Sequence, residues 1–398
     1  MSTKKKIVLA FSGGLDTSYC VPYLKQTYEA EVHTVLVNTG GFDQEKLEKK
    51  EQHAYNLGAD THQNIEQTED FYQKVIRFLI FGNVLKNHTY PLSVSSERVF
   101  QAVAIAKYAQ QIGADAIAHG STGAGNDQVR FDLIFNVIAP DLEIITPIRD
   151  QQLSREEEVG FLQDHGFDFD WAKSKYSINQ GLWGTSVGGA ETLTSNQALP
   201  EDAWPSQLKK QESQTILLEF ENGEPVGLNG QELFPVELIQ KLEKLASAYA
   251  IGRDIHVGDT IIGIKGRVGF EASAPLILIK AHQLLEKHTL AKWQLYWKDQ
   301  LSEWYGMLLH EGQYLDPVMR NIETFLEDTQ ENVSGTVSIA LHPYRFELEG
   351  ISSPNDLMNA EFGDYGEMNK AWSSQDVKGF AKILSNQIKI HESVNNYD

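Results

Sequence analysis

The feature that most constrains this chain is a glycine-containing loop near its start, between a predicted strand and a predicted helix. The apolar run Ile7 to Phe11 is followed by Ser-Gly-Gly-Leu-Asp-Thr-Ser from Ser12 to Ser18, and a helical pattern then continues to Thr27. Two glycines let the backbone approach a ligand closely, while helix amides and loop hydroxyls supply donors for phosphate oxygens. The sequence therefore predicts an anion-binding loop. It is neither a Walker loop nor a Gly-x-Gly-x-x-Gly loop, because the residues those motifs require are missing.

The hydrophobic pattern divides the chain into three parts. Residues 1–166 alternate short apolar runs with longer amphipathic segments, as strand and helix units of a largely parallel sheet do. Residues 167–354 are rich in turns and alternating strands, with an Asn222-Gly223 hairpin turn, which predicts an α+β domain. Residues 355–398 form a polar arm that packs either on another subunit or back on its own domain. The apolar stripe of its last predicted helix consists of Val377, Phe380, Ala381, Leu384 and Ile388.

Composition narrows the classes of partner. Subtracting 55 acidic from 34 basic side chains leaves a net charge of −21, which argues against a general nucleic-acid or anionic-membrane binder. The single cysteine, Cys20, excludes an intramolecular disulfide framework and suits a reducing compartment. No run of about 18 apolar residues predicts a membrane span. We therefore expect a cytoplasmic protein with small-molecule ligands.

A second string runs from His119 to Phe131 and reads His-Gly-Ser-Thr-Gly-Ala-Gly-Asn-Asp-Gln-Val-Arg-Phe. The first loop resembles the pyrophosphate loop of the ATP pyrophosphatase superfamily, whose members cleave ATP between its α- and β-phosphates and adenylate an oxygen. Together the two strings resemble those of the argininosuccinate synthase family. The resemblance covers nearly the whole chain, continuing through Tyr90 to Arg98, Tyr176-Ser177 with Ser186, and Gly252-Arg253 with Lys265-Gly-Arg267.

This resemblance implies both a fold and a reaction. The implied fold class is α/β, with a Rossmann-like, parallel-sheet nucleotide-binding domain of the adenine nucleotide α-hydrolase type, an α+β synthetase domain and a C-terminal helical arm. The implied enzyme is an AMP-forming carbon–nitrogen ligase of arginine biosynthesis, which joins citrulline and L-aspartate through citrullyl-AMP and releases argininosuccinate, AMP and pyrophosphate. It also implies ATP as co-substrate, Mg²⁺ as cofactor and a homotetramer held partly by the arm.

Site residues follow from the resemblance position by position. Those expected around ATP are Ala10, Phe11, Ser12, Gly13, Gly14, Leu15, Asp16, Thr17, Ser18, Val37 and Gly120. Those expected around aspartate are Thr122, Asn126 and Asp127. Those expected around citrulline are Tyr90, Ser95, Asn126, Arg130, Ser177, Ser186, Gly258 and Phe270. Asp16 is also the candidate Mg²⁺ ligand, although an aspartate at a helix start can simply be a cap.

The implied chemistry consists of two displacements. The ureido oxygen of citrulline attacks the α-phosphorus and expels pyrophosphate, and the α-amine of aspartate then attacks the activated carbon. Positioning and charge neutralisation dominate such a reaction, so no nucleophilic serine or cysteine is expected. We expect loop amides, Mg²⁺, Arg130 and Arg98 to meet the anionic substrates. Asp127 is the candidate base for the amine.

Four positions depart from the family pattern. Gly258 stands where a glutamate is usual and Phe270 where a tyrosine is usual, both at the α-amino end of citrulline. Glycine supplies neither charge nor volume there, so we expect open space beside it. This raises an alternative in which the acceptor is an N-acetyl or N-succinyl citrulline. Val99 and Ala124 replace the usual proline and lysine without an assigned effect.

Two further functions remain to be weighed. Enzymes that modify tRNA share the first loop, but the acidic charge disfavours tRNA and one cysteine cannot supply a thiolating pair. A non-catalytic nucleotide sensor is the other, and the intact Gly-Asn-Asp-Gln-Val-Arg string speaks against it.

Overall fold

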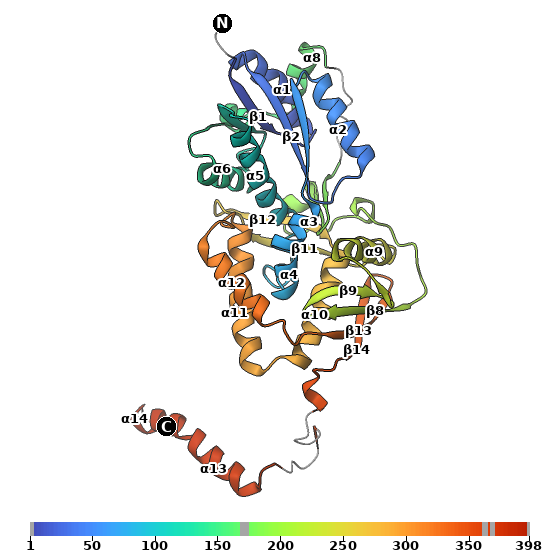
Figure 1. Ribbon diagram of the computed structural model, residues 1–398, viewed down its shortest axis with the longest axis vertical. Helices are drawn as coiled ribbons and strands as arrows, with labels where there is room; N and C mark the ends of the chain where they lie inside the picture. The colour runs from blue at the N-terminus through green and yellow to red at the C-terminus, as the bar shows by residue number, and fades with distance from the viewer. Residues whose placement is uncertain (1–3, 168–174, 360–364, 367–370, 396–398) are drawn as a thin grey trace.

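The computed structural model describes residues 4–167, 175–359, 365–366 and 371–395. The molecule is elongated, with the N-terminal domain at one end and the C-terminal arm leaving the body at the other (Figure 1). Between them lie two antiparallel sheets and a group of helices. This arrangement confirms the predicted fold class.

The N-terminal domain is built on a five-stranded parallel sheet of order β3-β2-β1-β4-β5. Its strands are β1 (Lys6–Ala10), β2 (Glu31–Asn38), β3 (Thr61–Glu66), β4 (Ala116–His119) and β5 (Glu143–Ile145). The chain runs outward from β1 in both directions, which makes the β1/β4 boundary a topological switch point. Ligands of open α/β sheets bind at the carboxyl edge of such a boundary. The glycine loop follows β1 there.

Alternate side chains of β1 enter different cores, which explains why helices cover both faces of the sheet. Ile7 and Leu9 pack with α1 (Leu15–Tyr28), α2 (Gln44–Asn56) and α8 (Arg155–Asp164) on one face. Val8 and Ala10 pack on the other face, against α5 (Ser93–Gln111) and α6 (Asp127–Ile138). The first loop thus leads into α1 on one face and the second string into α6 on the other.

The second region contains two antiparallel sheets of order β10-β9-β8-β13-β14 and β11-β12-β7-β6. Its helices are α9 (Pro235–Ser247), α10 (Ser273–Thr289), α11 (Lys292–His310) and α12 (Pro317–Asp328). Asn222 and Gly223, at φ 49° and 78°, form the predicted hairpin turn between β8 and β9. The strands are β6 (Ser177–Gly181), β7 (Gly184–Gly188), β8 (Gln214–Glu221), β9 (Glu224–Leu228), β10 (Gln231–Glu232), β11 (Arg253–Asp259), β12 (Lys265–Glu271), β13 (Gly335–His342) and β14 (Arg345–Ser352).

Short helices connect these elements. They are α3 (Thr68–Phe71), the π-helix η1 (Tyr72–Ile76), α4 (Arg77–Phe81), α7 (Pro147–Gln151), and the 3₁₀ turns η2 (Ala190–Leu193), η3 (Glu201–Ala203) and η4 (Leu357–Asn359). Within the described residues, no helix has the length and apolar character needed to cross a bilayer.

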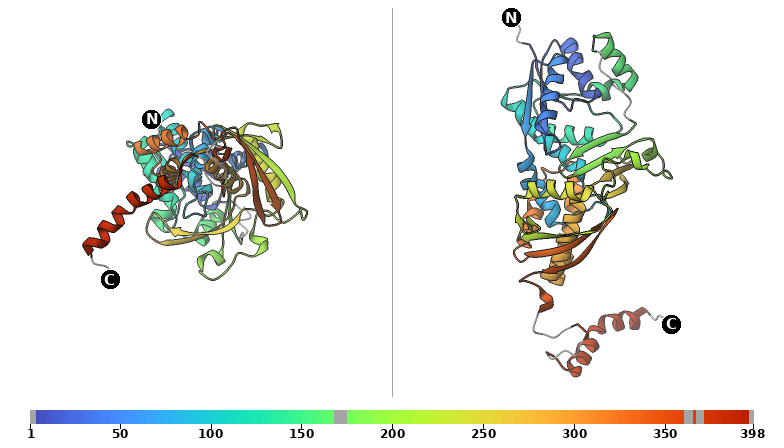
Figure 2. Two further views of the ribbon diagram at one scale, coloured as in Figure 1. Left: turned by 90° about the horizontal axis from the view of Figure 1, so that it is seen from below. Right: turned by 90° about the vertical axis from the view of Figure 1, so that its right-hand side faces the viewer.

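The arm consists of two helices, α13 (Ser374–Leu384) and α14 (Asn386–Asn395), rather than the single helix predicted. Ser385 ends α13, so Ile388 belongs to the second helix. Both helices lie apart from the body in Figure 1 and in the right-hand view of Figure 2, and Phe380 is 66% exposed. In the described part of the chain, the apolar stripe therefore does not pack on its own domain.

Candidate active site

A cavity of about 700 Å³ opens at the carboxyl edge of the parallel sheet. Its wall combines the loop after β1, the end of β2, the start of α6 and strand β6. Of the predicted site residues, those on the wall are Ala10, Phe11, Ser12, Gly14, Leu15, Asp16, Thr17, Val37, Gly120, Thr122, Asp127 and Ser177. The cavity therefore brings together most of the residues expected around ATP with some of those expected around aspartate and around citrulline.

The loop after β1 is shaped to receive an anion. Gly13 has φ 69°, a left-handed conformation that favours glycine. No side chain caps the N-terminus of α1, which leaves its first amides available to a ligand. The hydroxyls of Ser12 and Thr17 lie 3.2 Å apart at the cavity wall. The hydroxyl of Ser18, by contrast, is buried and pairs with His53 Nε2 at 2.8 Å.

Gly120 joins the two loops. A Cβ atom at this position would lie 3.1 Å from the Asp16 carbonyl carbon and 3.2 Å from the Thr17 amide nitrogen. Such contacts are tighter than side chains ordinarily make, so glycine permits this close approach. The first loop and the second string consequently share one wall of the cavity.

Asp16 is paired with a second carboxyl group. Its side chain hydrogen-bonds to Glu158 on α8, and burial raises the pKa of Asp16 above its usual value. Burial and the neighbouring Asp16 charge raise the pKa of Glu158 to about 8. Each carboxyl group is therefore more easily protonated than an isolated one. No group of three His, Cys, Asp or Glu side chains suited to a metal ion occurs in the described residues.

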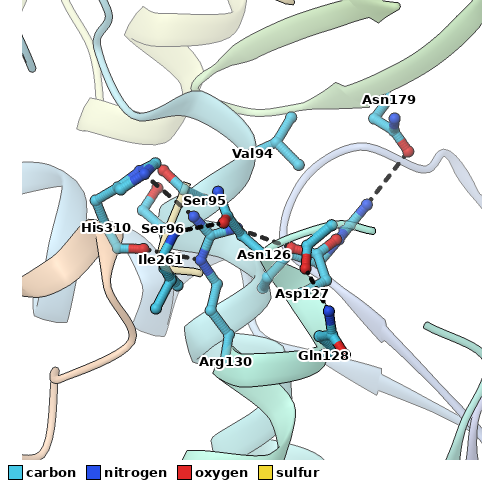
Figure 3. Close-up of polar contacts among 12 residues, drawn as sticks. Val94, Ser95, Ser96, Asn126, Asp127, Gln128, Arg130, Asn179, Ile261 and His310 are labelled. Carbon is cyan, nitrogen blue, oxygen red and sulfur yellow. Dashed lines mark hydrogen bonds and ion pairs between the residues drawn. The ribbon is translucent and has the colours of Figure 1, made fainter. Parts of the chain in front are cut away.

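Asp127 lies between two arginines, of which Figure 3 labels Arg130. Its Oδ1 accepts from Arg130 Nη1 at 2.8 Å and its Oδ2 from Arg98 Nε at 3.2 Å. Burial would raise the pKa of Asp127, but the two guanidinium groups outweigh burial and hold the pKa below its usual value. A carboxylate held ionised in this way is a poor proton acceptor, which argues against the expected role as a base.

Arg130 is not among the residues that line the cavity. Its side chain is buried, and Nε donates to the backbone carbonyl of His310 at 2.9 Å (Figure 3). The expectation that Arg130 meets the anionic substrates directly stays a prediction. Burial, Arg130 and nearby cations lower the pKa of His310 to about 2, so that imidazole is neutral.

The remaining citrulline residues lie beyond the cavity wall. Tyr90 packs against Phe270, with ring centroids 5.3 Å apart, and Phe270 pairs with Ser186 across β12 and β7. Asn126 Oδ1 accepts from the Ile261 amide at 2.8 Å, which ties α6 to the turn between β11 and β12 (Figure 3). Ser95, labelled in the same view, is buried and donates to Leu92 O at 3.4 Å.

Gly258 does not border open space. A Cβ atom there would lie 2.7 Å from His256 Nε2 and 3.2 Å from Asn87 Nδ2. The His256 ring also stacks on Tyr90, with centroids 5.0 Å apart. The space expected beside Gly258 is thus filled by two polar side chains, and the acyl pocket inferred from it is not present in this form.

Sequence reasoning missed several cavity residues. Lys46 and Lys50 reach the wall from α2, Gln101 from α5 and Asn179 from β6. Glu97 also lines the cavity, and burial raises its pKa to about 8. The lysines are four residues apart on α2 and so share one face of that helix, which is the signal that could have found them.

Comparison with known proteins identifies the family. Models described as the arginosuccinate synthase N-terminal HUP domain and C-terminal domain match residues 6–168 and 176–391. The chain belongs to the argininosuccinate synthase family. It is 38% identical to argininosuccinate synthase of Dictyoglomus turgidum over 96% of both chains. It is 35% identical to argininosuccinate synthase of Methanocaldococcus jannaschii over 97% of both, and 35% identical to that of Xanthomonas campestris over 99% of this chain and all of the other.

Membership in the argininosuccinate synthase family confirms the resemblance predicted from the two strings, and with it an ATP-dependent ligase. These relatives argue against the tRNA-modifying and sensor alternatives. They give no support to an acylated acceptor, because each is named for argininosuccinate itself.

Proposed function

We propose that this chain joins citrulline and L-aspartate at the expense of ATP, through citrullyl-AMP, and releases argininosuccinate, AMP and pyrophosphate. The observation that carries the proposal is the meeting of the loop after β1 with the second string in one cavity of a synthase-family fold. A nucleotide and two small substrates can contact one another only if the residues for each face a common space.

The first displacement depends on the loop after β1. We assign to Ser12, Thr17 and the amides at the start of α1 the ATP phosphates, with the Val37 backbone beside the adenine. These donors neutralise the charge that develops on the departing pyrophosphate. Asp16 would hold Mg²⁺, which neutralises phosphate charge when bound and commonly uses one or two carboxylates with substrate phosphates. That assignment requires Asp16 to be ionised, against the rise in its pKa that burial causes.

The second displacement depends on the start of α6. Thr122 and Asn126 are assigned to the carboxylates of aspartate, since hydroxyl and amide groups donate to such groups. Asp127 is assigned the charge of the incoming α-ammonium group, and it also fixes Arg98 and Arg130. Ser177 is assigned to citrulline at the cavity wall, with Tyr90, Ser186 and Phe270 behind it.

The assembly proposed is a homotetramer in the cytoplasm, built from domains 1–166 and 167–354 and the arm 355–398. Two exposed apolar faces support self-association. The first is the arm stripe. The second lies on α11 and consists of Trp293, Tyr296, Trp297 and Trp304, each more than half exposed. A buried, lone Cys20 and a requirement for ATP suit a reducing compartment.

The reaction can be tested by measuring pyrophosphate release with each substrate omitted in turn. We expect release to require free citrulline, and argininosuccinate to form only when aspartate is added. Release driven by tRNA, or a kcat/KM that favours acylated citrulline over free citrulline, would contradict the proposal.

A further inference from the structure

Helix α2 presents one lysine differently from its neighbours. Lys49 is exposed and pairs with Glu45 at 2.5 Å, and Lys46 lies 3.7 Å from Asp43. Lys50 is half-buried at the cavity wall, and no carboxylate in the described parts of the chain lies within ion-pair distance of it. In a chain with 55 acidic residues, a cation without a carboxylate partner is notable.

The side chain of Lys50 lies across the loop after β1. Its Nζ donates to the Gly13 carbonyl at 3.1 Å. A Cβ atom at Gly13 would lie 2.6 Å from Lys50 Cδ and 3.0 Å from Nζ, so glycine at this position makes room for the lysine. The ammonium group is therefore held at the phosphate loop by geometry that involves both elements.

The ammonium group retains capacity for a further ligand. It carries three N–H donors, and the Gly13 carbonyl accepts from one of them. Burial lowers the pKa of Lys50, which means that its charge is held at a cost in the absence of an anion. An anion in the cavity would supply the missing partner and offset that cost.

The neighbouring groups indicate which anion this is. Ser12, Thr17 and the uncapped start of α1 face the same end of the cavity as Lys50, and all of them donate hydrogen bonds. Ser177 and the start of α6 also line the cavity and serve the acceptor substrates in the proposed function. The part of ATP that remains for Lys50 is its β- and γ-phosphates, which leave as pyrophosphate.

We infer that Lys50 binds the β- and γ-phosphates of ATP and stays bound to the pyrophosphate that leaves. The identity of the nucleotide rests on the proposed function. The inference adds a phosphate-binding cation from α2 that neither string contains.

Binding measurements without citrulline or aspartate test this inference. Calorimetry with ATP, sodium pyrophosphate and AMP would be run on the wild type, on Lys50→Gln and on the matched control Lys49→Gln. We expect Lys50→Gln to bind ATP and pyrophosphate about tenfold or more weakly, since a charge-assisted hydrogen bond is lost. AMP binding should be unchanged, because AMP lacks both groups, and the control should match the wild type throughout.

Two results would overturn the inference. One is unchanged pyrophosphate affinity in Lys50→Gln. The other is equal weakening of AMP and ATP binding, which would mean that the substitution disturbs the whole loop. Failure of the proposed function gives a different pattern: the wild type would bind ATP and pyrophosphate through Lys50 yet form no argininosuccinate.

Discussion

Asp127 Oδ1 lies 2.8 Å from Arg130 Nη1, and Oδ2 of the same carboxylate lies 3.2 Å from Arg98 Nε. One carboxylate thus fixes an arginine from its own helix and another from α5. Arg98 in turn donates to Asn179 on β6 at 3.3 Å. Asp127, Arg98 and Asn179 therefore link α6, α5 and β6 around the cavity. The start of α6 acts as a junction as well as a binding segment.

The first prediction concerns this junction. Asp127→Asn should lower kcat/KM for aspartate by roughly 10- to 100-fold, because charged hydrogen bonds are lost and two arginines lose their counter-ion. Steady-state kinetics with aspartate as the varied substrate measure the effect. The exposed Asp141→Asn is the control and should leave kcat/KM unchanged. An Asp127→Asn enzyme with normal kinetics would show that the junction is dispensable.

Much of this arrangement could be predicted from the sequence. The strand and glycine loop at β1, the helix after that loop and the hairpin at Asn222 all follow local rules of turns and periodicity. Orientation over long distances could not be predicted in this way. Arg130 turns toward His310, which is 180 residues away, and Lys50 reaches Gly13 from another helix.

Gly258 is a second case in which packing could not be predicted from the sequence. The missing side chain predicts open space beside Gly258, but His256, two residues along the same strand, places its Nε2 atom 2.7 Å from where a Cβ atom would lie. A substitution pattern reports what a position lacks, whereas packing decides whether a cavity results, since interiors are filled closely.

The second prediction tests that packing. Gly258→Ala should displace the His256 ring from Tyr90, since the added Cβ would lie 2.7 Å from His256 Nε2. We expect the KM for citrulline to rise several-fold in Gly258→Ala. When His256→Ala is already present, adding Gly258→Ala should change the KM for citrulline little further, because the clash with the His256 ring is already relieved. Additive effects in this double-mutant cycle would contradict the contact.

The third prediction concerns Glu97 and pH. Burial raises the pKa of Glu97 to about 8 despite Arg98, the Thr39 hydroxyl and the Leu182 amide, which each lower it. The folded protein therefore binds this proton more tightly than the unfolded chain does. The stability it contributes is complete below the ordinary glutamate pKa of 4.5 and is lost as pH rises through about 8.

Glu97→Gln removes this pH dependence. The Tm of Glu97→Gln relative to the wild type should consequently rise between about pH 5 and about pH 8. Calorimetric scans at several pH values measure the difference, and the exposed Glu303→Gln serves as the control. A constant difference across this interval would place the Glu97 pKa near that of an ordinary glutamate.

The fourth prediction concerns a buried ion pair in the second region. Lys298 Nζ lies 2.9 Å from Glu286 Oε2, with the two side chains 0% and 1% exposed. Gln330 Nε2 also donates to Glu286 Oε1 at 3.0 Å. Lys298→Met should lower the free energy of unfolding by about 3–5 kcal/mol, because it leaves a buried carboxylate without its cation.

Chemical denaturation measures this loss, and the exposed pair of Lys241 with Glu237 provides the comparison. Lys241→Met should cost no more than about 1 kcal/mol. Replacing both members of the buried pair, as Lys298→Met/Glu286→Gln, should recover part of the stability. If Lys298→Met and Lys241→Met lowered the free energy of unfolding equally, the buried ion pair would be worth no more to stability than the exposed one.

The last prediction concerns the arm. Phe380 and Ile383 on α13 are 66% and 71% exposed, which is a costly arrangement for an isolated chain in water. If the stripe packs on another copy, Phe380→Asp should shift the particle from tetramer to smaller species in size-exclusion chromatography with light scattering. Truncation after residue 354 should produce the same shift. Lys382→Gln, on the polar side of the same helix, also makes the charge one unit more negative and should leave the assembly intact. A tetramer that survives both Phe380→Asp and truncation would assign its interfaces to the body of the molecule, where the aromatic residues of α11 are the next surface to substitute.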